Sequence, residues 1–287
     1  MGFLDKFCQR TMTLGDGTKI SYDIRNGRPQ VKREENGSYS IFNANGATIT
    51  GSKNGSNVSI YGGNNVTFNG KGDGRDNVSL FDCNGTKVNG NAGNDNISVF
   101  GGRNNTVNGG KGNDNITNYG NGTTINGGRG NDSIYSIANG TSISGGRGND
   151  SIYSRGDNNY INGGRGNDSI TSTGYRNNVQ GGRGRDSMSV FGSGNMINGG
   201  RGNDSIYANG NDNYIRGGRG RDSIYSNGSY NDIRGGFGND YISSMGSHNN
   251  VLGGWGNDNI NSFGFDNYNR GGFGFDRVNT NHRRYFG

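Results

Sequence analysis

The chain has 287 residues, 60 of them glycine, with 27% hydrophobic residues and a formal net charge of +6. So few apolar residues argue against a conventional globular core, and the basic charge invites a polyanionic partner. No apolar run is long enough to cross a bilayer. The N-terminus, MGFLDKFCQR, lacks the apolar region of a secretory signal peptide, and Lys6 replaces the Ser or Thr of a myristoylation signal. We therefore expect no membrane span, no lipid anchor and no export by the general secretory route.

The first 40 residues differ in composition from the rest, because they contain the only proline and both glutamates of the chain. Two short strands are expected here, at 19–24 and 38–42, joined by a polar turn segment at 26–37. A solenoid leaves the apolar cross-section of its first coil open to water, and a non-repeating segment can cover it. We predict such an N-terminal cap over residues 1–40, with a partner-binding or targeting head as the alternative. The apolar side chains available for capping are Phe3, Leu4, Phe7, Tyr22 and Ile24.

Glycine-rich turns alternate with short β-prone runs from residue 41 onward, loosely at first and regularly from Val107. Apolar residues then recur every nine residues, a spacing too long for a helical turn and too regular for hairpins. These apolar residues are Val107, Ile116, Ile125, Ile134, Ile143, Ile152, Ile161, Ile170, Val179, Met188, Ile197, Ile206, Ile215, Ile224, Ile233, Ile242, Val251 and Ile260.

A nine-residue spacing inside an 18-residue repeat fits a coil of two short strands and two turns, in which each strand points one aliphatic side chain inward. Successive coils would then stack as parallel strands. The sequence therefore predicts an all-β fold, a parallel β-roll or β-solenoid with 18-residue coils. We expect about 12–13 coils over residues 41–278 and a C-terminal tail at 279–287.

The two turns of each coil are chemically different. One carries the motif GGxGxD, and the other carries an asparagine column that begins at Asn105 and passes through Thr123 and Thr141. Because asparagine tolerates left-handed backbone and its amide can donate to a carbonyl of the neighbouring coil, we expect a structural role for this column. Its later members are Asn159, Asn177, Asn195, Asn213, Asn231, Asn249 and Asn267.

The aspartate of GGxGxD would form a column of stacked carboxylates. Neighbouring carboxylates repel each other by about 1 kcal/mol in water and by more in a less polar corner. Bound Ca²⁺ would neutralise them, because it prefers carboxylate and carbonyl oxygens, whereas Mg²⁺ demands tighter octahedral geometry. The candidate Ca²⁺ ligands are Asp76, Asp95, Asp114, Asp132, Asp150, Asp168, Asp186, Asp204, Asp222, Asp240, Asp258 and Asp276.

An arginine column lies three residues before these aspartates and is the competing neutraliser, through an Arg–Asp ladder without metal. Asp95 and Asp258 persist in turns that have no basic residue, which favours Ca²⁺. The same arginines would form a cationic stripe that binds an acidic polysaccharide, nucleic acid or another polyanion, or else only a solvated face. The column consists of Arg129, Arg147, Arg165, Arg183, Arg201 and Arg219.

The segments GGRGNDSIY, GGKGNDNIT, GGFGNDYIS and GGWGNDNIN resemble the GGxGxDxUx nonapeptide of the RTX (repeats-in-toxin) family, over roughly residues 69–278. The resemblance implies a parallel β-roll with Ca²⁺ between stacked turns, in a secreted protein often exported without an N-terminal signal. The chain departs from the family pattern in three ways. Alternate nonapeptides such as SRGDNNYIN lack the aspartate, so ions would form one row only. The chain is basic, and it has no attached enzymatic or lytic domain and no clear C-terminal export signal.

No catalytic constellation is visible. His248 and His282 have no cysteine or carboxylate at a metal-ligand or nucleophile-base spacing. Cys8 and Cys83 are too few and too far apart for a disulfide framework or a zinc site, so we expect free or buried thiols.

We interpret the chain as a non-enzymatic, structural or adhesive β-roll that binds Ca²⁺. One alternative is a polyanion- or polysaccharide-binding module, and another is a self-assembling filament or surface-layer subunit. We expect an extracellular location reached without an N-terminal signal peptide, with the cytoplasm as the alternative. Assembly as a homo-oligomer or end to end would use the C-terminal aromatic residues Phe237, Trp255, Phe263, Phe265, Phe273 and Phe275.

Overall fold

The structure is a computed structural model that describes residues 8–281, divided into two compact units, 1–146 and 147–287. The described residues form thirty β-strands and one 3-10 helix, η1 (Ile24–Asn26), which confirms the all-β prediction. No described helix has the length and apolar character needed to cross a membrane.

The strands of the first unit follow one another at short intervals, and the last of them, β15, reaches one residue past its end. They are β1 (Gln9–Thr13), β2 (Lys19–Asp23), β3 (Gln30–Arg33), β4 (Tyr39–Phe42), β5 (Thr48–Thr50), β6 (Asn57–Tyr61), β7 (Thr67–Asn69), β8 (Asn77–Phe81), β9 (Lys87–Ala92), β10 (Asn96–Phe100), β11 (Thr106–Lys111), β12 (Asn115–Asn118), β13 (Thr124–Arg129), β14 (Ser133–Ile137) and β15 (Ser142–Arg147).

The strands of the second unit keep a stricter rhythm of five and six residues. They are β16 (Ser151–Arg155), β17 (Tyr160–Arg165), β18 (Ser169–Thr173), β19 (Asn178–Arg183), β20 (Ser187–Phe191), β21 (Met196–Arg201), β22 (Ser205–Asn209), β23 (Tyr214–Arg219), β24 (Ser223–Asn227), β25 (Asp232–Phe237), β26 (Tyr241–Met245), β27 (Asn250–Trp255), β28 (Asn259–Phe263), β29 (Tyr268–Phe273) and β30 (Arg277–Asn281).

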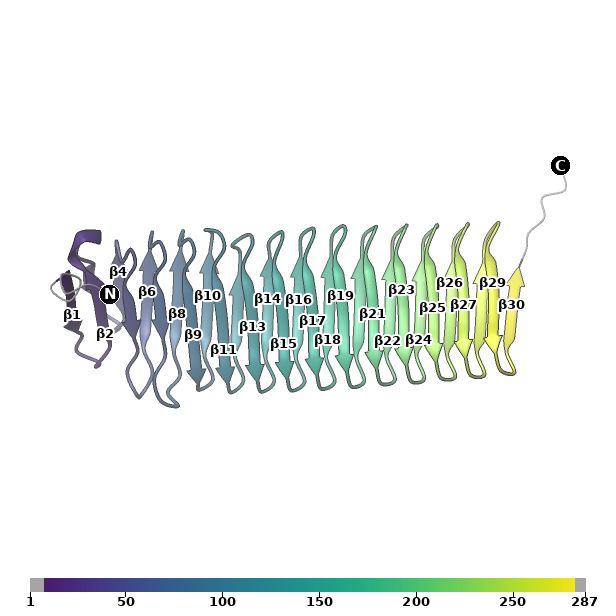
Figure 1. The fold of residues 1–287 in the computed structure, drawn as a ribbon, viewed down its shortest axis with the longest axis horizontal. Coiled ribbons are helices and arrows are strands. Elements are labelled where there is room, and N and C mark those ends of the chain that lie inside the picture. The colour runs from purple at the N-terminus through teal and green to yellow at the C-terminus, as the bar shows by residue number, and fades with distance from the viewer. Residues whose placement is uncertain (1–7, 282–287) are drawn as a thin grey trace. The chain divides into compact units, whose positions relative to one another are not determined.

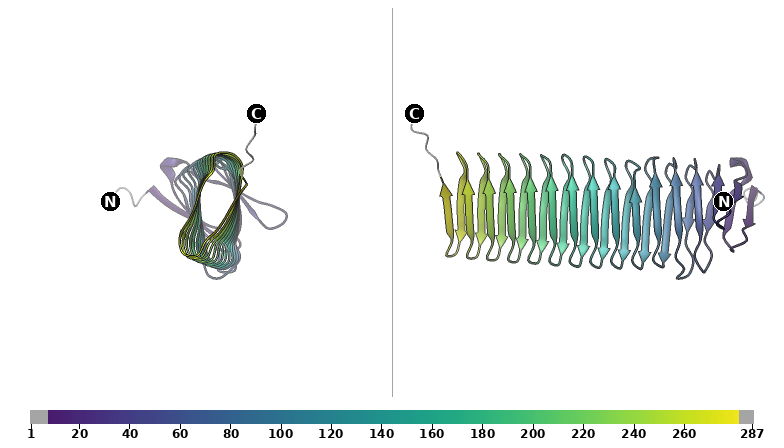
Figure 2. Two further views of the ribbon diagram at one scale, coloured as in Figure 1. Left: turned by 90° about the vertical axis from the view of Figure 1, so that its right-hand side faces the viewer. Right: turned by 180° about the vertical axis from the view of Figure 1, so that it is seen from behind.

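Each unit contains two sheets, and from β4 onward each strand is followed by a strand of the other sheet (Figure 1). In the first unit, sheet A has the order β1-β2-β5-β7-β9-β11-β13-β15 and sheet B the order β3-β4-β6-β8-β10-β12-β14. In the second unit, sheet A holds the odd strands from β17 to β29 and sheet B the even strands from β16 to β30. A coil seen end-on is a flattened loop whose two strands face each other (Figure 2).

Successive coils pair in parallel, and the pairing joins residues 18 positions apart in the regular part of the chain. Ile206 lies opposite Ile224 in sheet B, and Ile215 lies opposite Ile233 in sheet A. The prediction of a parallel β-solenoid with 18-residue coils is therefore confirmed.

The first strands differ from the others because they pair antiparallel: β1 with β2, β2 with β5, and β3 with β4. β2 and β4 confirm the two strands expected near the N-terminus. The prediction of a polar turn over 26–37 was wrong in part, because β3 lies inside it; the polar run QVKR is held by its pairing with β4 and not by its own apolar pattern.

The proposed capping residues divide between buried, exposed and undescribed positions. Tyr22 is buried, but Ile24 is 48% exposed. Phe3, Leu4 and Phe7 lie outside the described residues, as do His282 and the end of the expected tail. The limits of the cap and of the tail stay predictions.

The core consists of one inward aliphatic residue per strand, as predicted. All eighteen members of the nine-residue series from Val107 to Ile260 are at most 2% exposed. The earlier coils of the first unit add a second apolar residue per sheet B strand, namely Ile60, Leu80 and Val99. Most later coils place serine there, with Asn118, Val190 and Ala208 as the exceptions, and the buried hydroxyl of Ser172 has no hydrogen-bond partner among the described residues. The later coils therefore have less apolar material with which to hold themselves together.

Candidate metal centre

The GGxGxD turn of each coil, which we call the Asp corner, points its aspartate into the coil and not toward solvent. Each of these turns joins the end of a sheet A strand to the start of the next sheet B strand. The eleven aspartates from Asp76 to Asp258 are at most 2% exposed, and Asp276, in the last described coil, is half-buried. The structure thus brings the predicted ligands into one inward-facing column in each unit.

One oxygen of each carboxylate is held by the backbone of the coil before it. The N–H of Asp186 donates to Oδ1 of Asp204 at 2.9 Å, and the N–H of Asp204 donates to Oδ1 of Asp222 at 2.9 Å. The same bond joins Asp222 to Asp240 at 2.8 Å. This ladder fixes the side-chain orientation in every coil and aligns the carboxylates in a row.

The second oxygen, Oδ2, is buried without a hydrogen-bond donor. A buried polar atom without a partner is costly, and a buried charged one more so. Because the same unpaired oxygen recurs in coil after coil, it is a property of the motif. The aspartates whose Oδ2 atoms are in this state are Asp76, Asp95, Asp114, Asp168, Asp186, Asp204, Asp222, Asp240 and Asp258.

The first glycine of each GG pair makes room for that oxygen. A Cβ atom on Gly217 would lie 2.5 Å from Oδ2 of Asp222 and 2.6 Å from the carbonyl oxygen of Gly235, so both oxygens crowd the same glycine. The glycine after the variable residue serves the backbone instead: Gly220 has φ of +133°, and a Cβ there would meet the carbonyl oxygen of Gly202 at 1.8 Å. The motif therefore creates a tight corner in which oxygens face one another.

Burial raises the pKa of these carboxyl groups. It lifts the pKa of Asp168 and of Asp222 from 3.8 to about 7, against the lowering effect of the backbone N–H that each accepts, and neighbouring aspartates raise both further. For the same first cause the pKa of Asp204 and of Asp240 rises to about 6. The column therefore resists ionisation unless a cation accompanies it.

The donor set suits Ca²⁺ better than a transition metal. No group of three or more His, Cys, Asp or Glu residues among the described positions could hold a metal ion by itself. The oxygens at the corner are a carboxylate Oδ2 and backbone carbonyls, which are hard ligands of the kind that Ca²⁺ accepts with flexible geometry. The inward Oδ2 atoms and the crowded glycine carbonyls thus fit a row of calcium ions.

The competing Arg–Asp ladder does not form. Arg165, Arg183 and Arg201 are exposed at the variable position of the motif, whereas the aspartate of the same turn points inward. In the described chain no ion pair joins Arg165, Arg183 or Arg201 to an aspartate. The alternation of side chains around the corner sends the two residues to opposite faces, so arginine cannot neutralise the buried carboxylate.

The second turn of each coil, which we call the Asn corner, confirms the structural role expected for asparagine. The N–H of Asn213 donates to Oδ1 of Asn231, and that of Asn231 donates to Oδ1 of Asn249, both at 2.8 Å. The amide nitrogen supplies what the carboxylate lacks: Nδ2 of Asn231 donates to the carbonyl of Gly210 at 3.1 Å, and Nδ2 of Asn249 to that of Gly228 at 3.0 Å. In most coils the polar atoms of this corner are therefore hydrogen-bonded within the protein and need no ion.

The structure gives His248 an acidic neighbour that no local sequence spacing indicated. Its Nε2 lies 3.5 Å from Oδ2 of Asp266, and its ring stacks on Tyr230 at 4.8 Å between centroids. Both partners sit 18 residues away, so the repeat period was the signal that could have found them. All three residues lie at the exposed tip of the Asn corner and are far from being a buried acid–base pair.

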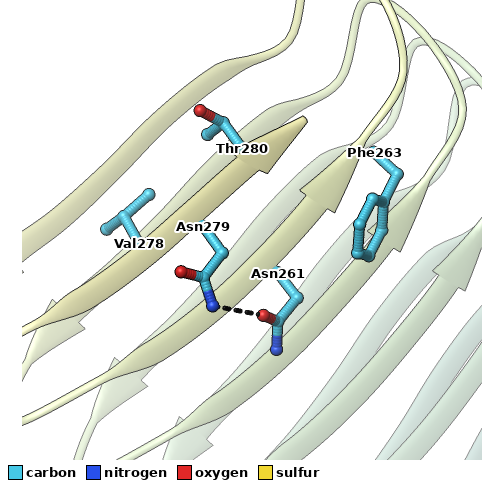
Figure 3. Close-up of a pocket in the computed structure, with 5 residues that line it drawn as sticks. All are labelled: Asn261, Phe263, Val278, Asn279 and Thr280. Atoms are coloured by element: carbon cyan, nitrogen blue, oxygen red, sulfur yellow. Dashed lines mark hydrogen bonds between the residues drawn. The ribbon is translucent and has the colours of Figure 1, made fainter. Parts of the chain in front are cut away.

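The pocket near the last described strands carries no chemistry of its own. It has a volume of about 520 Å³ and is lined by Asn261, Phe263, Val278, Asn279 and Thr280 (Figure 3). Two of its polar side chains are hydrogen-bonded to each other, because Nδ2 of Asn279 donates to Oδ1 of Asn261 at 2.8 Å. None of the lining residues is a carboxylate, histidine or cysteine. Cys8 and Cys83 are free thiols, as predicted.

A family model for the RTX calcium-binding nonapeptide repeat, in four copies, matches residues 101–117, 119–136, 140–170, 191–224 and 227–260. The chain is an RTX β-roll repeat protein. The matches begin at residue 101 and do not cover the looser coils from residue 69, where the resemblance was expected to start, nor residues 171–190 and 261–278. Searches of curated proteins and of solved structures each returned no match.

Proposed function

We propose that this RTX β-roll is a non-enzymatic structural or adhesive protein that holds one row of Ca²⁺ along the Asp corner. The ligands are the twelve aspartates from Asp76 to Asp276, together with glycine carbonyls of the adjoining turns. The observation that carries this proposal is the inward Oδ2 atom left without a donor in coil after coil. A divalent cation would supply the missing partner and cancel the repulsion between neighbouring carboxylates.

The row is single because the other corner is already satisfied. Asn231 and Asn249 use their amide nitrogens to reach the glycine carbonyls that an ion would otherwise contact. An amide carries no charge to attract a cation. The uncharged, hydrogen-bonded Asn corner therefore supports a single row of ions, where a GGxGxD motif at both turns would give two rows.

We place the protein outside the cell, where free Ca²⁺ is plentiful and RTX repeat proteins typically act. Coils with a thin apolar core and a buried carboxylate would gain most of their stability when calcium binds, so folding would follow export. The long repeat of stacked coils supports a structural or adhesive role.

Calorimetry tests the calcium proposal directly. Filling one site at about a hundred times its Kd adds about 2.7 kcal/mol of stability, so several sites together should raise the Tm by tens of degrees over calcium-free protein. Mg²⁺ at the same concentration is the control and should have a much smaller effect. An identical melting curve with calcium and with EGTA would refute the proposal.

A further inference from the structure

Six arginines of the second unit form a continuous cationic stripe on the outer side of the Asp corner. Arg165, Arg183, Arg201 and Arg219 end the sheet A strands β17, β19, β21 and β23 and lie directly opposite one another in the parallel register. Arg185 and Arg221 occupy the position just before the aspartate in two of these turns. All six side chains are exposed. We call these six residues the arginine stripe.

The arginine stripe has no counter-charge on the protein. None of its members takes part in an ion pair within residues 8–281, and the aspartates of the same turns point into the coils. Like charges placed directly opposite each other on neighbouring strands are destabilising. Arg219 lies over the ring of Phe237, with its guanidinium carbon 5.8 Å from the ring centroid, but among residues 8–281 no ion pair or ring contact offsets the repulsion between the other five arginines.

The fold does not require arginine at this position. Ala92, Phe237, Trp255 and Phe273 occupy the same place in other coils and keep the same parallel pairing. Neutral side chains thus serve the backbone equally well. A run of arginines in four consecutive coils, where neutral residues suffice, is a feature of the surface and not of the architecture.

Hydrogen-bond donors that carry no charge accompany the stripe. Asn167 and Asn203 are exposed beside it, and each uses Oδ1 to accept the backbone N–H of Arg185 or Arg221 at 2.7 and 2.8 Å. Their amide nitrogens have no partner among the described residues and remain available to hydroxyl or carboxylate oxygens. No aromatic residue occurs in the GGxGx segments of these four coils.

We propose that the arginine stripe binds an acidic polysaccharide that lies along the stacked coils. Coils repeat at about 4.8 Å, so the guanidinium groups offer one positive charge per coil to a polymer that carries about one anionic group per sugar ring. Arginine binds carboxylate and sulfate oxygens in a bidentate manner, and the asparagine amides reach ring hydroxyls. A single-stranded nucleic acid fits the stripe itself less well, because bases stack on aromatic side chains and these four coils have none there; the aromatic column of Phe237, Trp255 and Phe273 begins only in the coil after Arg219. The proposal is independent of the calcium row.

Binding of dextran sulfate, with uncharged dextran as the neutral polymer, tests this inference. We expect the full chain in calcium-containing buffer to bind dextran sulfate and not dextran, with affinity that falls as salt rises. Replacing four arginines of the stripe by glutamine should weaken binding by at least about tenfold, because each removes one charge-assisted contact. The four changes are Arg165→Gln, Arg183→Gln, Arg201→Gln and Arg219→Gln.

A control variant that loses the same number of arginines elsewhere shows whether binding depends on the arginine stripe or only on the net positive charge of the protein. It carries Arg155→Gln, Arg176→Gln, Arg216→Gln and Arg270→Gln, at arginines that lie outside the stripe. Circular dichroism melts in calcium confirm that each variant is folded, and Arg185→Gln with Arg221→Gln provides a milder stripe variant whose smaller loss is expected in the same direction. Equal loss in stripe and control variants would overturn the proposal. Displacement of dextran sulfate by poly-deoxythymidylate at equal charge concentration would assign the stripe to nucleic acid instead and would also overturn it.

Discussion

The Asp corner and the Asn corner of each coil have the same backbone-to-side-chain hydrogen bond and differ in the second side-chain atom, which is Oδ2 in aspartate and Nδ2 in asparagine. At both corners a backbone N–H donates to Oδ1 of the equivalent residue in the next coil, at 2.8 Å for Asp222 and for Asn231 alike. At the Asn corner the second side-chain atom is a donor and reaches a glycine carbonyl. At the Asp corner it is an acceptor, and it is left among other oxygens. The two side chains have nearly the same shape. The corners therefore differ only because the second side-chain atom is a hydrogen-bond donor in asparagine and an acceptor in aspartate.

This difference shows how a repeat protein can limit its dependence on metal. In most coils the asparagine side chain finds hydrogen-bond partners for both of its polar atoms within the protein. The second oxygen of the aspartate finds a partner only when a cation or a proton is bound. Two Asn corners are exceptions, because the amide nitrogens of Asn195 and Asn213 lack a hydrogen-bond partner among the described residues. Those amides are neutral, however, and cost less than a buried charge.

The largest expected effect comes from ionising the whole Asp column without calcium. Burial raises the pKa of Asp168 and Asp222 from 3.8 to about 7 and that of Asp204 and Asp240 to about 6, so the folded chain binds protons that the unfolded chain releases. The stabilisation is therefore full below about pH 4 and is lost as the pH rises through 6 to 7. Thermal melts of calcium-free protein between pH 5 and about 8 should show a steadily falling Tm.

Calcium should reverse that slope, because the ion binds the ionised carboxylate and competes with protons. The same melts in saturating calcium are the control. A calcium-free Tm that rises with pH across this interval would contradict the assignment of buried, proton-holding aspartates.

Exchanging aspartate and asparagine between the two corners tests whether the second side-chain atom accounts for their difference. The variant with Asp186→Asn, Asp204→Asn and Asp222→Asn gives three Asp corners an amide that can donate to a glycine carbonyl. At neutral pH without calcium it should be more stable than the native chain by about 1–3 kcal/mol per site, because three buried unpaired acceptors are removed. Isothermal titration should show correspondingly fewer calcium ions bound.

The reciprocal change is the matched control. Asn231→Asp and Asn249→Asp place a carboxylate where Nδ2 now donates to Gly210 and Gly228, and should destabilise the calcium-free roll by a similar amount per site. If both exchanges lower stability equally, the packing of each corner and not its hydrogen bonding distinguishes them.

The smallest expected effect is steric and distinguishes the glycines of the two corners. In Gly199→Ala the added Cβ would lie 2.6 Å from Oδ2 of Asp204 and 2.5 Å from the carbonyl oxygen of Gly217, and should cost about 3 kcal/mol. In Gly194→Ala, at the tip of the Asn corner, the nearest atom is Cγ of Arg176 at 3.5 Å, so only the φ of +69° opposes alanine, at about 1 kcal/mol. Urea unfolding in calcium measures both; equal losses would show that the Asp corner is not crowded.

Much of the fold was predictable because a strict period leaves few alternatives. The nine-residue recurrence of aliphatic residues such as Ile206 and Ile215 predicted two inward columns, and both are buried. β1 and β3 were not predicted, because their polar sequences become strands only through antiparallel partners. The neighbourhood of His248 and Asp266 was also missed, since it appears only when the chain is read at an offset of one coil.

The sequence alone was enough to predict the repeat, the coil of two strands and two turns, and an aspartate column that needs a partner. The inward direction of the aspartates and the outward direction of the arginines became clear only from the fold. The physical reason is local space: the first glycine of each pair leaves room inside the corner for Oδ2 of residues such as Asp222, while the exposed variable position leaves Arg219 in solvent. That division separates a buried oxygen row suited to calcium from an outer row of unpaired positive charge.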